Sequence, residues 1–191
     1  MTENSQSPIV EDPRPKTLIT PESLLIVNTG DGKGKSTAAF GIMIRGVARG
    51  WKVGVVQFVK SGDWNVGEEK IGRQIGVDWI TLGEGFSWDS ANLEKDQATG
   101  AAAWAQALDL LNGGMYDLLI FDELTYPMNW NWIDTKSVLE ALVARPKHVH
   151  VVVTGRDAPQ ELIEIADTVS NVQNVKHAYQ QGYKAKRGID Y

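Results

Sequence analysis

A short loop between an apolar run and a helical pattern carries the residues best suited to chemistry. It contains Gly30, Gly32 and Gly34, followed directly by Lys35 and Ser36. Glycines let backbone N–H groups close around an anion, and a helix that begins at Lys35 adds the positive end of its dipole. The lysine supplies a point charge for a phosphate, and the serine supplies a hydroxyl for Mg²⁺. The pattern predicts a phosphate-binding loop.

This loop departs from the general phosphate-loop template, which is G-x-x-x-x-G-K-[ST]. Counted back from Gly34, the first glycine of the template falls on Thr29, and Gly30 comes one place late. The alternating glycines partly imitate a dinucleotide fingerprint, but Lys35 stands where that fingerprint has its third glycine. The alternative is a glycine-rich turn with an incidental Lys-Ser pair. The flanking strand and helix favour the phosphate loop, because they are what its mechanism requires.

The segments around the loop alternate between strand and helix patterns. Nearly continuous apolar runs are typical of parallel strands covered on both faces. Their alternation with helices predicts an α/β fold of the P-loop NTPase-like (RecA-like) class, a mostly parallel sheet with helices on both faces. We expect strands at 24–27, 53–59, 77–82, 118–121 and 149–153 with a short last one within 168–175, and helices at 35–49, 67–75, 91–111, 135–144 and up to about 166.

Unusual polar and glycine-rich segments follow the predicted strands, whereas the opposite loops are plain. In open α/β sheets ligands bind beyond the carboxyl ends of the strands. The one-sided distribution therefore predicts an active site at that edge of the sheet. After the glycine loop, these segments are Lys60-Ser61-Gly62, Gly83 to Ser90, Asp122-Glu123 and Thr154-Gly155-Arg156.

Three of these segments suggest a role. Asp122 and Glu123 resemble the acidic pair that holds Mg²⁺ in phosphate-loop enzymes, with a solvated strand end or a helix cap as the alternative. Arg156 is placed to reach a phosphate or a ribose, unless it is a surface arginine near a helix start. Phe86 and Trp88 either stack on a flat ligand or anchor their loop on the core.

Two further patterns concern local structure. Asp157 and Gln160, with Pro159 in the first turn, resemble a capping pair at a helix start. His148 and His150 alternate along a predicted strand and so face the same side. A metal role for these histidines is the less favoured interpretation, and a structural role is expected.

Composition bounds the class of protein. The 191 residues suit one α/β domain, predicted at 23–191, preceded by a proline-broken flexible arm at 1–22. A net charge of −5 argues against a nucleic-acid partner. The absence of cysteine excludes disulfides and thiol catalysis and indicates a cytoplasmic location. No stretch approaches the roughly 20 apolar residues of a membrane span, so no membrane partner is expected.

The residues alone thus predict an ATP-type triphosphate site with Mg²⁺, but they leave the reaction open. A hydrolase, a kinase and an alkyl transferase all use such parts. A non-catalytic nucleotide-binding module is a further alternative.

At this point the sequence resembles a known family, the phosphate-loop ATP:corrinoid adenosyltransferases. The resemblance covers residues from about 24 to 191, and the loop that departs from the general template has the form found in the family. It rests on five motifs in order, which are Thr29 to Gly41, Gly85 to Asp89, Asp122 to Tyr126, Val153 to Arg156, and Val175 to Ala178 with Gly188 to Tyr191.

The resemblance implies a reaction in which the Co(I) of a corrinoid attacks the 5′ carbon of ATP and triphosphate leaves. It implies that Phe86 and Trp88 form an apolar wall beneath the corrin, favouring a four-coordinate Co(II) that is easier to reduce. ATP is expected to lie reversed in the loop, with its 5′ carbon pointing out. A flavoprotein reductant and a homodimer are also implied. The proline-broken arm is a departure, because family members carry a charged helical segment there.

The expected site therefore falls into three groups. The catalytic residues are Lys35, Phe86, Trp88 and Glu123, and the Mg²⁺ ligands are Ser36, Asp122 and Glu123. ATP and the corrinoid are the substrates. The nucleotide-binding residues are Thr29, Gly30, Asp31, Gly32, Lys33, Gly34, Lys35, Ser36, Thr37, Arg45 and Arg156.

Overall fold

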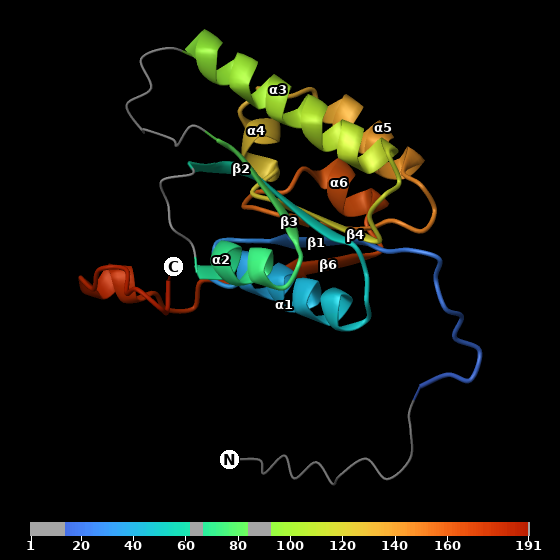
Figure 1. Ribbon diagram of the computed structural model, residues 1–191. Coiled ribbons are helices and arrows are strands. Elements are labelled where there is room, and N and C mark those ends of the chain that lie inside the picture. Colours follow the sequence, from blue (N-terminus) through green and yellow to red (C-terminus); the bar gives the residue numbers. More distant parts are fainter. Residues whose placement is uncertain (1–13, 62–66, 84–92, 191) are drawn as a thin grey trace, which may run out of the picture.

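A computed structural model describes residues 14–61, 67–83 and 93–190 (Figure 1). Phe86 and Trp88 lie outside the described residues, as does most of the predicted arm. Residues 14–22 are exposed and form no helix or strand. Among the helices of the described ranges, none is long and apolar enough to cross a membrane.

The described chain is built on a six-stranded sheet whose spatial order is β3-β2-β4-β5-β1-β6. All neighbouring strands run parallel. The predicted parallel α/β sheet is therefore confirmed. The strands are β1 Leu25–Thr29, β2 Val53–Ser61, β3 Asp78–Gly83, β4 Leu118–Asp122, β5 His150–Thr154 and β6 Thr168–Asn171.

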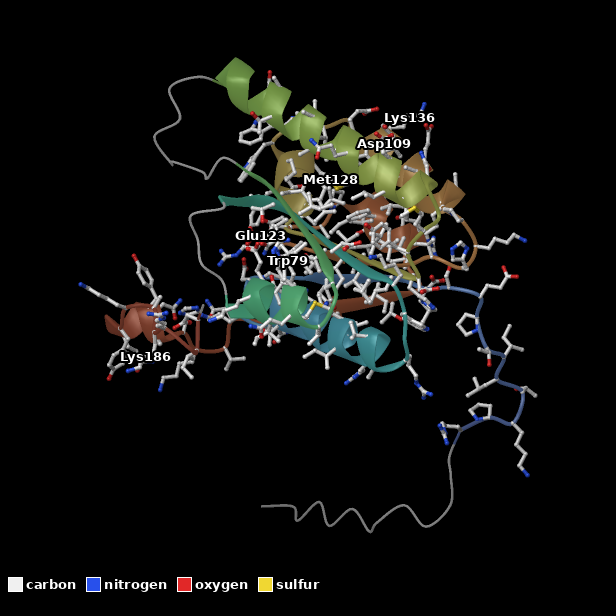
Figure 2. All side chains as sticks on the ribbon, in the orientation of Figure 1. Trp79, Asp109, Glu123, Met128, Lys136 and Lys186 are labelled. Carbon is white, nitrogen blue, oxygen red and sulfur yellow. The ribbon has the colours of Figure 1, made fainter. Side chains whose placement is uncertain are left out.

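Helices cover both faces of this sheet, as expected (Figure 1). One face carries α1 (Lys35–Ala48) and α2 (Gly67–Gln74). The other carries α3 (Leu93–Asn112), α4 (Thr125–Asn129), α5 (Thr135–Ala144) and α6 (Gln160–Ile165). Figure 2 shows Trp79 on the α1–α2 side, with Asp109, Met128 and Lys136 on the opposite side.

Each face has its own apolar core, because successive strand residues point to opposite sides. On the α1 side, Phe40 and Met43 pack with Val55 and Trp79. On the α3 side, the larger core joins β-strand residues such as Phe121 to Trp104 and other helix residues. Burial on both faces explains the apolar strand runs read from the sequence.

Local expectations were less accurate than the sheet. The capping pair is wrong, because Asp157 adopts a positive φ of 50° and Pro159 is the N-cap residue of α6 without a side-chain cap bond. The short helix α4 was not predicted, and the last strand ends at Asn171. A 3₁₀ helix, η1, forms at Ala178–Gln181 in the terminal segment.

The two histidines serve structure. His148 precedes β5 instead of lying on it, and its Nε2 is 3.0 Å from the carbonyl oxygen of Gly114. His150 Nδ1 accepts a 3.1 Å hydrogen bond from Leu24 N, and its ring stacks on Trp51 at 4.7 Å. Within the described ranges, no group of three or more His, Asp or Glu side chains forms a metal site.

Candidate active site

The glycine loop connects β1 to α1 and is closed by its own lysine. Lys35, the first residue of α1, donates from Nζ to the carbonyl oxygens of Gly30 and Gly32, at 2.7 Å each. These bonds hold the ammonium over the loop at the positive end of the α1 dipole. A phosphate placed there would meet a preformed cationic cradle.

The glycines are required by backbone geometry and by a close approach. Gly30 and Gly34 have φ values of +99° and +117°, which side chains rarely adopt. A Cβ on Gly30 would lie 2.6 Å from the carbonyl oxygen of Val172, and one on Gly32 would lie 2.4 Å from that of Gln173. The loop is thus packed against the segment that follows β6.

That segment is hydrogen-bonded to the loop from behind. Gly32 N donates to the Val172 oxygen at 2.7 Å, and Val172 N donates to the Thr29 oxygen at 2.8 Å. Farther along, Asp190 pairs with Lys33 Nζ. Figure 2 shows Lys186 in this terminal segment. Sequence reasoning missed this support, because nothing in the spacing of residues 171–173 refers to residues 29–32.

Opposing charges act on the Lys35 ammonium. Burial lowers the pKa of Lys35, and the nearby Arg156 guanidinium lowers it further. The carboxylates of Asp31, Glu123 and Asp122 act in the opposite direction on the same pKa. The predicted acidic pair and Arg156 are therefore brought within electrostatic reach of the loop lysine.

The acidic pair sits at the carboxyl end of β4. Asp122 is fully buried, and its two carboxylate oxygens accept hydrogen bonds from Gln57 Nε2 at 3.0 Å and Thr154 Oγ1 at 2.7 Å. Glu123 follows with a positive φ of 65°, a strained conformation for a residue with a side chain. Strain of this kind is common where backbone must aim a functional group.

Arg156 belongs to a loop that α4 fastens in place. Thr125 Oγ1 donates to the Arg156 carbonyl oxygen at 2.6 Å, and Asn129 Nδ2 donates to the Asp157 oxygen at 3.0 Å. Gly155, with φ +144°, leaves room for Thr125, since a Cβ would lie 2.0 Å from its Oγ1. The Arg156 guanidinium is left half-exposed, 3.9 Å from Asp31.

Three aromatic rings in and after α4, which the sequence analysis did not single out, stack on one another. Tyr126 stacks on Trp130 with ring centroids 5.2 Å apart, and Trp130 meets Trp132 at 5.0 Å. Burial raises the pKa of Tyr126, with the nearby Glu123 carboxylate as the next cause. The Trp-Asn-Trp run in the sequence was the available signal.

The remaining predicted residues differ in position. Ser36 lies half-buried in the first turn of α1, next to the exposed Thr37. Thr29 Oγ1 accepts a 3.1 Å bond from Ala158 N. Arg45 is exposed in the last turn of α1, about 15 Å along the helix from Lys35 at 1.5 Å per residue, so this chain does not bring it to the loop.

Three similar proteins of known name are all corrinoid adenosyltransferases. Corrinoid adenosyltransferase CobA of Salmonella typhimurium is 43% identical over 168 residues, covering 88% of this chain and 85% of the relative. A corrinoid adenosyltransferase of Escherichia coli K12 is 44% identical over the same length and shares. One of Pseudomonas aeruginosa is 42% identical over 170 residues, covering 88% of this chain and 83% of the relative.

Structural similarity is more distant. A KaiC-like protein, PH0186 from Pyrococcus horikoshii OT3, is 15% identical with a TM-score of 0.46, covering 78% of this chain and 71% of its own.

The family model described as "ATP:corrinoid adenosyltransferase BtuR/CobO/CobP" matches residues 21–191. With a match that includes the phosphate loop, the acidic pair and the Arg156 loop, the chain belongs to the ATP:corrinoid adenosyltransferase family.

Proposed function

We propose that this chain transfers the 5′-deoxyadenosyl group of ATP to the Co(I) centre of a corrinoid and releases triphosphate. The observation that carries the proposal is the charged cradle at the start of α1. Lys35 is bonded to the loop carbonyls there, within electrostatic reach of Asp122, Glu123 and Arg156. This cradle lies in a chain that matches the adenosyltransferase family from residue 21 to 191.

The reaction needs a held leaving group more than a base. Co(I) supplies the electron pair of the new cobalt–carbon bond, and the bond between C5′ and the triphosphate oxygen breaks. Triphosphate departs with the electron pair of the broken C5′–O bond. Because Co(I) attacks without a proton, none must be removed from the nucleophile. The loop N–H groups and Lys35 stabilise the growing negative charge, and the same contacts aim C5′ at cobalt.

The donor set at the loop fits Mg²⁺. Hydroxyl and carboxylate oxygens are the ligands this cation prefers, and Ser36, Asp122 and Glu123 supply them. Asp122 and Glu123 also act on the pKa of Lys35, which puts their charge near the triphosphate position. When bound, Mg²⁺ would neutralise charge on the leaving triphosphate.

The orientation of ATP and the corrinoid wall remain part of the proposal. ATP lies reversed in the loop, with its phosphate tail held deep and its 5′ carbon outward. Phe86 and Trp88, which lie outside the described residues, form the apolar wall that keeps the lower axial ligand off cobalt. Support comes from the family motif Gly85 to Asp89.

The wider setting is proposed on the same basis. A flavoprotein supplies the electron that produces Co(I), and two copies of the chain form a homodimer in the cytoplasm. A nucleotide-binding role for Arg45 also remains a proposal, although Arg45 is exposed on α1 and lies away from the loop of its own chain.

Product analysis tests the function. With ATP and reduced corrinoid, the expected products are triphosphate and an adenosylated corrinoid, with no triphosphate when the corrinoid is omitted. ADP with orthophosphate would instead indicate a phosphate-loop ATPase, and ADP with a phosphorylated acceptor would indicate a kinase; either result would end the proposal.

A paired variant tests the aromatic wall. The double variant Phe86→Ala, Trp88→Ala should bind ATP as the wild type does, yet fail to adenosylate when cob(II)alamin is the starting corrinoid. Spectral titration with the corrinoid should show loss of the axial ligand in the wild type alone. Equal activity of the variant would remove the wall from the mechanism.

A further inference from the structure

Polar residues form one continuous row across the carboxyl end of the sheet, on the α1 side. Register pairs Gln57 with both Thr81 and Asp122, and Asn28 with both Thr154 and Ser170. Thr154 follows the pair Phe121 with Val153 and so lies beside Asp122. This polar row consists of Thr81, Gln57, Asp122, Thr154, Asn28 and Ser170.

The row replaces an apolar layer at the point where α1 begins. Two residues earlier on the same face, Val55, Ile120 and Val152 pack in the α1 core. In the row, Asn28 Nδ2 donates to the Lys35 carbonyl oxygen at 3.3 Å. The polar row is therefore joined to the start of α1, next to the glycine loop, through Asn28.

The orientation of the Gln57 amide is fixed by its partners. Trp79 Nε1 is 2.9 Å from Gln57 Oε1, and Gln57 Nε2 is 3.0 Å from Asp122 Oδ2. An indole N–H can only donate, so the amide oxygen must face Trp79 and the amide nitrogen must face Asp122. Gln57 and Trp79 are 1% and 3% exposed, so water does not compete for these bonds.

The orientation of the Thr154 hydroxyl is fixed by its partners as well. Its Oγ1 accepts from Glu123 N at 3.0 Å and is 2.7 Å from Asp122 Oδ1. A backbone N–H only donates, so the hydroxyl proton must point to Asp122. Asp122 consequently accepts a hydrogen bond at each of its two carboxylate oxygens, and these bonds fix its orientation.

The chain of bonds ends on the strained residue of the site. Glu123 has a φ of 65°, and its N–H is held by Thr154. A residue in this conformation persists where its surroundings over-determine it. The bonds from Trp79 through Gln57, Asp122 and Thr154 supply that restraint from four neighbouring strands, β3, β2, β4 and β5.

We propose that Gln57 is a positioning residue for the Mg²⁺–nucleotide site. By donating to Asp122, it fixes the carboxylate that orients Thr154, and Thr154 holds Glu123 where its side chain meets Mg²⁺. The inference rests on the proposed function in that Mg²⁺ is placed at Ser36, Asp122 and Glu123. Gln57 itself touches neither the nucleotide nor the corrinoid.

Nucleotide binding without corrinoid tests this role. ATP binding to the full chain is measured by equilibrium dialysis over a series of Mg²⁺ concentrations. Gln57→Leu removes both bonds at nearly constant volume, and the Mg²⁺ concentration for half-maximal binding should rise about 10-fold or more, the usual loss when a partner of a metal ligand is removed. Trp79→Phe frees the amide to turn, and a smaller rise is expected.

Tyr116→Phe is the matched control. Tyr116 is 5% exposed and donates a 3.0 Å bond to Asp78 at the opposite end of the sheet. Its loss should lower the thermal unfolding temperature but leave the Mg²⁺ dependence unchanged. In a Glu123→Gln background, Gln57→Leu should add little further loss, since both changes act on one chain of contacts.

The contrary outcomes are distinct. A Mg²⁺ dependence in Gln57→Leu equal to that of Tyr116→Phe would reduce the polar row to a structural role and overturn the inference. If Gln57→Leu does not fold, an unchanged Mg²⁺ dependence in Trp79→Phe would overturn it. Wild-type ATP binding that ignores Mg²⁺ would overturn both the Mg²⁺ placement and the inference, whereas ADP as the product with corrinoid would end only the proposed function.

Discussion

An aspartate at the carboxyl end of the sheet and one at the amino end differ in burial and in bonding partners. At the carboxyl end, Asp122 is fully buried and accepts from the neutral side chains Gln57 and Thr154. At the amino end, the Asp78 side chain is 44% exposed, pairs with Lys52 Nζ at 2.6 Å and accepts from Tyr116. Both are well bonded, but only the first has been removed from water.

This difference separates function from routine stabilisation. A buried carboxylate held by neutral donors keeps its charge available to a neighbouring cation or cationic ligand. An exposed ion pair satisfies itself and contributes little, because water and salt screen it. Changes at the carboxyl end should therefore alter ligand binding, and matched changes at the amino end should not.

The largest effect is expected from the loop lysine. Lys35→Ala removes the charge that we propose stabilises the leaving triphosphate, and kcat/KM for ATP with reduced corrinoid should fall about 10²- to 10³-fold. Lys52→Ala at the amino end should retain wild-type activity. Thermal unfolding checks that both variants fold. Equal activity in both would contradict the expected functional difference between the two ends of the sheet.

Two glycines with positive φ give the next comparison. Gly30→Ala meets the Val172 backbone at 2.6 Å, whereas Gly50, with φ +77°, has no atom within 4 Å of the added Cβ. Gly50→Ala should cost about 1–2 kcal/mol from backbone strain alone. Gly30→Ala should cost about 1–3 kcal/mol more from the collision and should also weaken ATP binding. Urea unfolding and ATP titration measure the two effects; similar losses would contradict the packing behind the loop.

Neutralising each aspartate sharpens the comparison in energy. In Asp122→Asn, the new amide N–H₂ group faces either Gln57 or Thr154, and both of these already point a donor at this position. One donor therefore loses its acceptor, and the free energy of unfolding should fall by about 2–4 kcal/mol. Asp78→Asn should cost less than about 1 kcal/mol. Denaturant midpoints at equal ionic strength distinguish the pair, and a larger loss for Asp78→Asn would reverse the assignment.

The smallest effect appears only at high pH. Burial, followed by the bond to Asp78, raises the pKa of Tyr116 from 10.0 to about 12. Between these values the unfolded chain releases the phenol proton while the folded protein keeps it, so stability falls as pH rises. Below pH 10 the group contributes no pH dependence. Tyr116→Phe should show a shallower decline than wild type in thermal unfolding above pH 10, and identical slopes would contradict the raised pKa.

The sequence predicted the sheet well because burial on two faces leaves a one-dimensional signal. Apolar runs located β1 to β5 to within about two residues, whereas the exposed β6 ends four residues before the predicted limit. The glycines marked the turn between β1 and α1. The helix predicted at 135–144 coincides with α5, Thr135–Ala144. The short helix α4 was not predicted because its five residues include Pro127 and span little more than one turn.

The contacts around the site could not be predicted from spacing. Asp122 was identified by its position after a strand, but Gln57 and Asn28 look like single polar residues within apolar runs. Their meaning depends on strand register, which brings residues from β2, β4, β5 and β1 into one row. The support of Gly32 by Val172 is likewise a long-range contact without a local pattern.

That support has a consequence for biogenesis. The backbone that braces Thr29 and Gly32 comes from residues translated far later than the loop itself. A nascent chain that has not yet exposed residues 171–173 would lack these bonds to the loop, and it should bind ATP poorly on the ribosome. Ligand affinity should therefore appear only after residues 171–173 have left the ribosome.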